Sequence, residues 1–212
     1  MAIDIQTVNL ALFMIGAKKL ASLSDDTKAA REANTVGDQC IKEVFDLPID
    51  WRFAVARAEL ARLAVTPAFG KYDYYYGKPE NCRRIIATVD EDEDDIEYDF
   101  DEEVYIDGAI QTDCIVCNEE EVFVKYIVLR DNPAVWPAYF KKLVAIRIAQ
   151  YLSGPMNPEG KAFYNKLVFL WDQAYDEAKS GNAARGARVN SNNERIDDGN
   201  TDIVNAADRD ME

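Results

Sequence analysis

Residues 51–84 read WRFAVARAELARLAVTPAFGKYDYYYGKPENCRR and contain the change of hydrophobic pattern that decides the fold. In Trp51–Leu63 the apolar side chains lie near one helical stripe with charged residues between them, which predicts an amphipathic helix. Pro67 and Gly70 end that pattern. A tyrosine-rich connector then leads through the turn at Gly77-Lys78-Pro79 into an extended segment. The stretch therefore predicts a junction between a helical and a β part.

Two more helices are predicted upstream of the junction. Apolar residues recur at spacings of three and four from Ile5 to Ile15, and Gly16 offers a left-handed stop. A second helix, with apolar residues along one face, is expected to begin after an N-cap at Ser24.

Short extended segments and then helices are predicted downstream. The segments are separated by turn residues and indicate an antiparallel sheet. The expected strands are Arg84–Val89, Ile96–Phe100, Val104–Ile106, Ile110–Thr112 and Val122–Leu129. A fourth helix is expected from Pro137 to the break at Ser153-Gly154-Pro155, and a fifth from Pro158 to Gly181.

The predicted fold class is α+β, mainly a helical bundle of about five helices with an inserted small antiparallel β-sheet lobe. The expected parts are bundle helices in 1–66, the connector and β lobe in 67–131, further bundle helices in 132–180, and an extended tail in 181–212. Few large apolar residues occur in that tail, so it is not expected to fold alone.

Charge restricts the choice of partner. The chain has 39 acidic and 24 basic residues, a formal net charge of −15, and no Lys or Arg between Asp90 and Glu121. A surface that grips phosphates would need the opposite sign. The acidic run is either a solvated loop or a surface that repels passing DNA. The candidates for the second interpretation are Asp90, Glu91, Asp92, Glu93, Asp94 and Asp95.

Catalytic and metal chemistry find little support. The chain has no histidine, which excludes Ser-His-Asp and Cys-His centres and the common zinc-histidine sites. A zinc site of Cys114 and Cys117 with Cys40 and Cys82 would have irregular spacing, so reduced buried thiols are the favoured interpretation. The acidic run lacks the glycine of a calcium loop. We expect no catalytic, cofactor-binding or metal-binding residue.

Composition indicates a soluble globular protein. Of the 212 residues, 48% are hydrophobic and 30% are charged. No apolar run is long enough to span a membrane, and Asp4 stands where a signal peptide would carry positive charge. We therefore expect the protein to stay in the cytoplasm where it is made.

The order of several short motifs resembles the tail tubular protein A family, the head-to-tail adaptors of short-tailed bacteriophages. Residues 51–84 are similar to its W-x-F-A-x-x-R-A-x-L-A and P-x-F-G-Y patterns, although Lys71 and Lys78 replace apolar members. Residues 8–17 with 23–27 look like its opening, and residues 131–149 look like its closing helix. The resemblance covers residues 5–180.

This resemblance implies a structural virion protein. It would form a ring, a dodecamer in that family, between the portal protein and the tail nozzle, and would extend the channel for double-stranded DNA without binding it specifically. The protein would move from the host cytoplasm to the head-tail junction of the virion. Its C-terminal tail would dock onto the portal through its sparse apolar residues, which are Val189, Ile196, Ile203 and Val204.

Arginine and tyrosine side chains near the junction are the candidates for contacts between subunits or with the tail. Tyrosine rings without a basic surround favour a protein interface or core-edge packing over base stacking. The arginines pair either with a neighbouring subunit or within the chain. The candidates are Arg52, Arg57, Arg62, Tyr72, Tyr74, Tyr75 and Tyr76.

Two functions of other classes remain open. An acidic binding module that mimics DNA would bind a basic protein tightly and form no ring. A carboxylate-dependent hydrolase attached to the tail would lose turnover when one or two acids are changed, but no pair of carboxylates stands out in the sequence.

Overall fold

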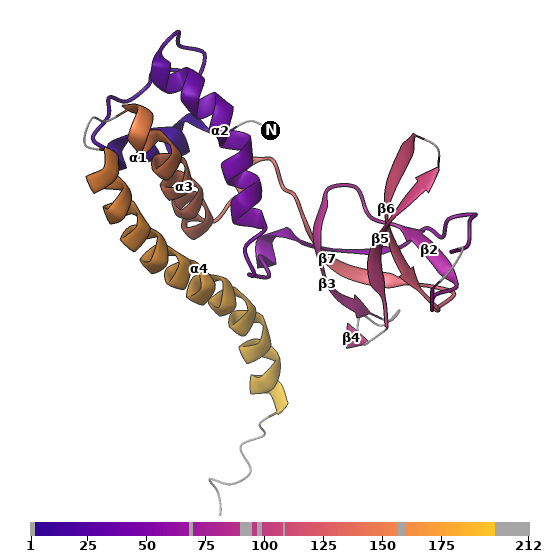
Figure 1. The fold of residues 1–212 in the computed structure, drawn as a ribbon. Coiled ribbons are helices and arrows are strands. Elements are labelled where there is room, and N and C mark those ends of the chain that lie inside the picture. The colour runs from indigo at the N-terminus through magenta and orange to yellow at the C-terminus, as the bar shows by residue number, and fades with distance from the viewer. Residues whose placement is uncertain are drawn as a thin grey trace, which may run out of the picture.

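The computed structural model describes residues 3–67, 70–89, 95–96, 99–107, 109–156 and 160–197. These residues form a helical lobe and a β lobe that lie side by side (Figure 1). The fold is α+β. The helical elements are α1 (Ile5–Met14), α2 (Lys28–Phe45), η1 (Arg52–Ala54), η2 (Pro133–Val135), α3 (Ala138–Met156) and α4 (Gly160–Asp197). The strands are β1 (Val55–Glu59), β2 (Tyr74–Gly77), β3 (Cys82–Val89), β4 (Asp95–Ile96), β5 (Asp101–Asp107), β6 (Ile110–Cys117) and β7 (Phe123–Val128).

The helical lobe is built around α3, which packs against α1, α2 and α4. Its core is aliphatic except at one end, where an aromatic cluster joins α2 and α3 to the junction. The rings of Trp51 and Phe140 meet edge to face with centroids 5.0 Å apart, and Phe45 lies 4.7 Å from Phe140. Such pairs add to the stabilisation that burial itself provides. The junction is thus anchored in the helical core.

The predicted end of α1 is confirmed, whereas the predicted start of α2 is wrong. Asp4 caps α1 by accepting a hydrogen bond from the Thr7 N–H, and Gly16 follows the helix with φ +69°, which confirms the left-handed stop. The prediction of Ser24 as the N-cap of α2 is wrong. Thr27 caps that helix, because its side chain accepts from the Ala30 N–H.

The predicted helix over Trp51–Leu63 is also wrong. Only the single turn η1 is helical, and β1 follows it immediately. β1 pairs antiparallel with β7, with Ala58 opposite Val124. Ala58 packs against the core of the β lobe, whereas Arg57 and Glu59 are exposed. The strand alternation of this segment therefore prevails over its helix-forming residues, and the described chain has four α-helices instead of five.

The β lobe contains two antiparallel sheets, formed by the part of the sequence between α2 and α3. The first sheet has the strand order β1-β7-β3-β4, and the second has the order β2-β6-β5. Their facing sides enclose a separate small core that includes Leu60, Tyr76, Ile115 and Val124. β2 was not predicted, since its tyrosines were assigned to the connector. The expected strands Arg84–Val89, Val104–Ile106, Ile110–Thr112 and Val122–Leu129 are present with longer or shorter bounds. The expected strand Ile96–Phe100 overlaps β4 only at Ile96, and Asp99 and Phe100 are not in a strand.

Ion pairs and backbone contacts join the two lobes. Arg83 at the start of β3 pairs with Asp46 after α2, and Arg84 Nη2 lies 2.8 Å from Asp50 Oδ1. Arg130 Nη1 donates to the Phe53 carbonyl at 2.9 Å. The junction is therefore tied at the end of α2 and on both chain segments that cross between the lobes.

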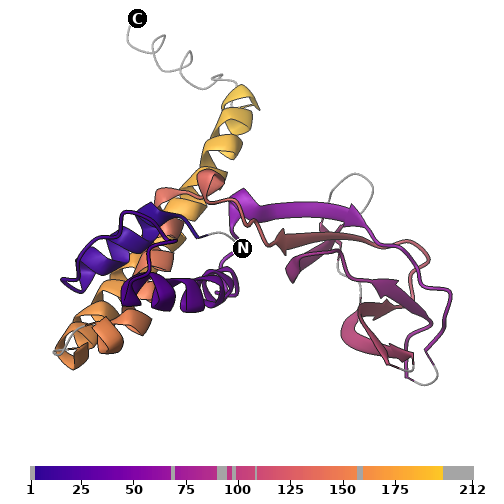
Figure 2. The ribbon, with the colours of Figure 1, turned by 90° about the horizontal axis from the view of Figure 1, so that it is seen from above.

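The C-terminal helix is longer than expected. α3 continues through the predicted break to Met156, and α4 continues past Gly181 to Asp197. The last part of α4 projects from the bundle (Figure 2). The predicted tail boundary at residue 181 is therefore wrong for the described residues. Of the portal-docking candidates, Val189 and Ile196 lie in α4, whereas Ile203 and Val204 lie outside the described residues.

Candidate interaction surfaces

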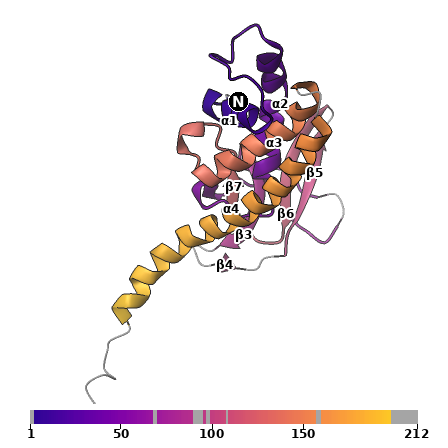
Figure 3. The same cartoon turned by 90° about the vertical axis from the view of Figure 1, so that its left-hand side faces the viewer.

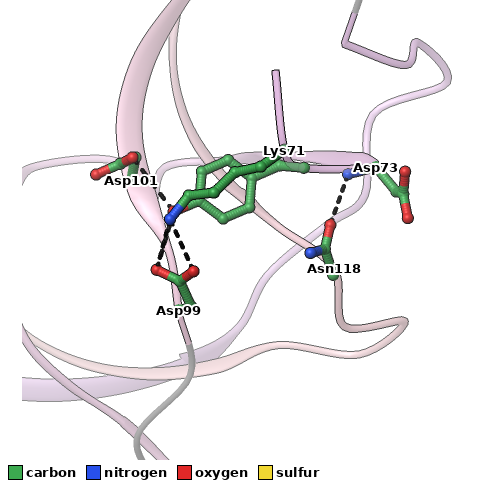
Figure 4. Close-up of polar contacts among 6 residues, drawn as sticks. Lys71, Asp73, Asp99, Asp101 and Asn118 are labelled. Carbon is green, nitrogen blue, oxygen red and sulfur yellow. Dashed lines mark hydrogen bonds and ion pairs between the residues drawn. The ribbon is translucent and has the colours of Figure 1, made fainter. Parts of the chain in front are cut away.

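The connector before β2 is fastened to the acidic segment before β5 by a lysine and a tyrosine. Lys71 Nζ lies 3.0 and 2.7 Å from the two carboxylate oxygens of Asp99 (Figure 4). The Tyr72 hydroxyl lies 3.1 Å from Asp99 Oδ1 and 3.2 Å from Asp101 Oδ2. The hydrogen bonds of Lys71 and Tyr72 lower the pKa of Asp99. Part of the acidic surface is thus neutralised within the lobe.

The four tyrosines divide into a buried and a partly exposed pair. Tyr72 and Tyr76 are buried, and the Tyr76 hydroxyl donates to the Glu119 carbonyl at 2.5 Å. Tyr75 is half-buried with its ring 5.4 Å from that of Tyr105, and Tyr74 lies under a guanidinium group. Only Tyr74 and Tyr75 therefore present ring surface to a partner.

The three candidate arginines do not gather at one place. Arg52 is exposed on η1, and Arg57 lies on β1 opposite Lys125. The Arg62 guanidinium stacks on the Tyr74 ring, 3.6 Å from its centroid. This cation–π contact is intramolecular. Arg62 therefore pairs within the chain, which is one of the two expected arrangements.

The acidic surface is described at β5 but not at most of its predicted members. Asp90, Glu91, Asp92, Glu93 and Asp94 lie outside the described residues, and Asp95 begins β4. On β5 four carboxylate residues are exposed, and one of them, Glu102, pairs with Lys78 Nζ at 2.6 Å. The exposed members are Asp101, Glu102, Glu103 and Asp107. This strand is an edge of its sheet, so its carboxylates oppose pairing with another strand edge.

A polar cluster that sequence analysis missed joins α2 to α3. Glu43 accepts hydrogen bonds from Gln39 at 3.0 Å, from Tyr151 at 2.8 Å and from Arg147. Burial opposes ionisation of Glu43, but these three bonds together lower its pKa. The Arg147 guanidinium also donates to Gln150 at 3.1 Å. The members of this cluster on α2 and those on α3 are too far apart in sequence for a local pattern to group them.

Arg147 also lines a groove between α3 and α4. Its guanidinium carbon lies 5.6 Å from the ring centroid of Tyr151 and 5.4 Å from that of Trp171. Beside it is a pocket of about 210 Å³, lined by Arg147, Gln150, Tyr151 and Tyr164. Tyr151 and Tyr164 are 43% and 46% exposed. Tyrosine, tryptophan and arginine are the residues that dominate binding energy in protein interfaces.

Several apolar side chains in the helical lobe are uncovered. On α1 they are Leu10 and Phe13, and on α4 they are Val168 and Phe169. Phe13 is 70% exposed and Phe169 is 62% exposed. Scattered exposed residues need no explanation, but those that adjoin a groove mark a candidate interface.

Neither a metal centre nor a reactive thiol was found in the part of the chain that the structure describes. No group of three Cys, Asp or Glu residues there could hold a metal ion. Cys40, Cys114 and Cys117 are buried and Cys82 is half-buried, all as free thiols. None of the described helices combines the length and apolarity that a membrane crossing requires.

Comparison with known proteins adds no relative. No protein-family model matches the chain, and no curated protein matches it either.

Proposed function

We propose that this chain is a structural head-to-tail adaptor of a short-tailed bacteriophage. It forms a ring, a dodecamer if it follows the family it resembles, between the portal protein and the tail nozzle, and extends the DNA channel. It carries out no bond-making step. It assembles in the host cytoplasm and ends at the head-tail junction.

The observation that carries the proposal is the projection of α4 from a two-lobe body. Among the side chains of α4 whose burial the structure describes, which end at Arg185, Asn182 is the last buried one, and the helix continues to Asp197 (Figure 3). A helical arm that projects beyond its own lobe draws most of its stability from a partner. An adaptor that docks on a portal ring provides such a partner.

The acidic charge of the β lobe agrees with the proposed passage of DNA. β5 exposes four carboxylates, and no Lys or Arg occurs between Asp90 and Glu121. A surface of this sign repels phosphates, so DNA could slide past it without specific contacts.

The test is to mix the protein with the portal ring encoded beside it and measure the stoichiometry by native mass spectrometry. A truncation after Arg185 is the matched variant, because it removes the arm and keeps the Asn182 contacts with Asp50 and Arg52. The proposal expects one copy per portal subunit and weaker binding of the truncation. Absence of binding at several salt concentrations would contradict it.

The alternative is an acidic binding module of the DNA-mimic type. The exposed carboxylates of β5 favour it. It predicts salt-sensitive binding to a basic protein and no ring. Binding to a basic partner without portal association would select this alternative.

A further inference from the structure

The lining of the groove beside Arg147 suits an aromatic side chain. It includes the guanidinium group of Arg147 and the rings of Tyr151 and Tyr164. A phenyl ring can stack on a guanidinium group and on tyrosine rings. The pocket of about 210 Å³ is large enough for one, since a cavity of about 150 Å³ holds benzene.

Beyond the groove, the same side of α4 carries first an apolar and then two acidic side chains. Val168 is one helical turn beyond Tyr164 and is 41% exposed. Asp172 and Asp176 follow at the same spacing of four, and both are exposed. Residues four apart lie on one face of a helix, so these four side chains form one line on α4.

The chain carries a surface that matches this groove. Leu10 and Phe13 lie three residues apart on α1 and form an uncovered apolar knob. Lys18 and Lys19 follow α1, and both side chains are exposed. The knob therefore has a basic neighbour, and the groove has an acidic one.

We propose that Leu10 and Phe13 of one copy insert into the groove between α3 and α4 of a second copy, with Lys18 and Lys19 facing Asp172 and Asp176. The two surfaces belong to different helices, so the contact is heterologous. Repeated contacts of this kind generate a ring when the rotation closes. The inference rests on the proposed ring and specifies which surfaces join its subunits.

The test uses one variant on each surface. Phe13→Asp removes the knob, and Val168→Asp places a charge beside the groove, within the proposed contact. Both residues are exposed, so both variants are expected to fold, which far-UV circular dichroism checks. Ile106→Asp is the matched control, because Ile106 is 60% exposed on β5 in the β lobe, outside both proposed surfaces.

Sedimentation velocity up to about 1 mM protein measures self-association. Wild type and Ile106→Asp are expected to associate alike. Phe13→Asp and Val168→Asp alone are each expected to associate about thirtyfold more weakly or not at all, as for a buried aromatic anchor. An equimolar mixture of these two is expected to form a one-to-one heterodimer, because one intact knob and one intact groove remain.

Three results would overturn the proposed contact. They are a wild type that stays monomeric at the highest concentration, a mixture without heterodimer, and equal loss of association in the Ile106→Asp control. A portal complex of unchanged stoichiometry with Phe13→Asp would overturn the contact and leave the adaptor function standing. Self-association through these surfaces without portal binding would support the contact and contradict the adaptor function.

Discussion

The side-chain Oδ1 of Asn182 accepts a hydrogen bond from the backbone N–H of Arg52 at 2.9 Å. Its Nδ2 donates to the Asp50 carbonyl at 2.7 Å, and the side chain is buried. One amide thus satisfies a donor and an acceptor of the segment that enters the β lobe. The start of the junction is therefore held by the buried side chain of Asn182 on α4.

Replacement of Asn182 by Ala is expected to lower the free energy of unfolding by about 1–3 kcal/mol, because it leaves two backbone groups without a partner. Urea unfolding measures the change. Gln173→Ala is the control, an exposed amide on the same helix, with an expected effect within about 0.5 kcal/mol. Equal effects of the two substitutions would show that the Asn182 bonds contribute nothing.

Replacement of Glu43 by Gln tests the polar cluster through its pH dependence. Although burial opposes it, the bonds from Gln39, Arg147 and Tyr151 lower the pKa of Glu43 below its ordinary value of 4.5. A carboxylate with a lowered pKa contributes stability above its unfolded pKa and loses it as the pH falls through the folded pKa. The difference between wild type and Glu43→Gln is therefore expected to be about 1.5–3 kcal/mol near pH 7.

That difference should shrink as the pH falls below 4.5. Chemical unfolding at a series of pH values measures it. Glu32→Gln is a suitable control, as a second glutamate on α2 that forms none of these bonds. A difference that is constant from pH 7 to pH 3 would contradict the role of ionised Glu43.

The sequence predicted the fold class and most elements because their patterns are local. α1 and α2 show apolar spacing of three and four, and the segments after Arg84 are extended. The segment Val55–Glu59 misled the prediction because alanine, arginine and glutamate are good helix formers. Pairing with β7, more than sixty residues away, decides its conformation. Local propensity has no access to that partner.

The candidate surfaces were less predictable than the fold. Tyrosine enrichment drew attention to the connector, but the exposure of each ring could not be known from the sequence, and Tyr76 is buried in the β lobe. Arg147 and Glu43 belong to different helices and meet only when α2 packs on α3. The one local sign of this pairing was the position of Arg147 in an otherwise apolar stretch of α3, since a charged residue in such a stretch usually needs a partner.

Cysteine reactivity gives a third prediction. Burial, reinforced by the nearby Glu43 carboxylate, raises the pKa of the Cys40 thiol to about 12. Burial also raises the pKa of Cys82, Cys114 and Cys117. Because the thiolate is the reactive form, Cys40 at pH 8 is expected to react about three orders of magnitude more slowly than an exposed thiol.

Titration with a chromogenic disulfide reagent measures this reactivity. The native protein is expected to react slowly, and the protein in guanidinium chloride is expected to release four equivalents at once. A Cys40→Ala variant identifies the contribution of that thiol. Fast reaction of Cys40 in the native protein would contradict its burial in the helical core.

Gly16 is expected to tolerate alanine poorly because of its backbone conformation. Gly16 has φ +69°, and an added Cβ would meet only Phe163 Cζ, at 3.9 Å. The change Gly16→Ala therefore tests backbone strain alone, with an expected loss of about 1–2 kcal/mol. Thermal unfolding measures the loss, and stabilisation by Gly16→Ala would show that α1 does not end in a left-handed residue.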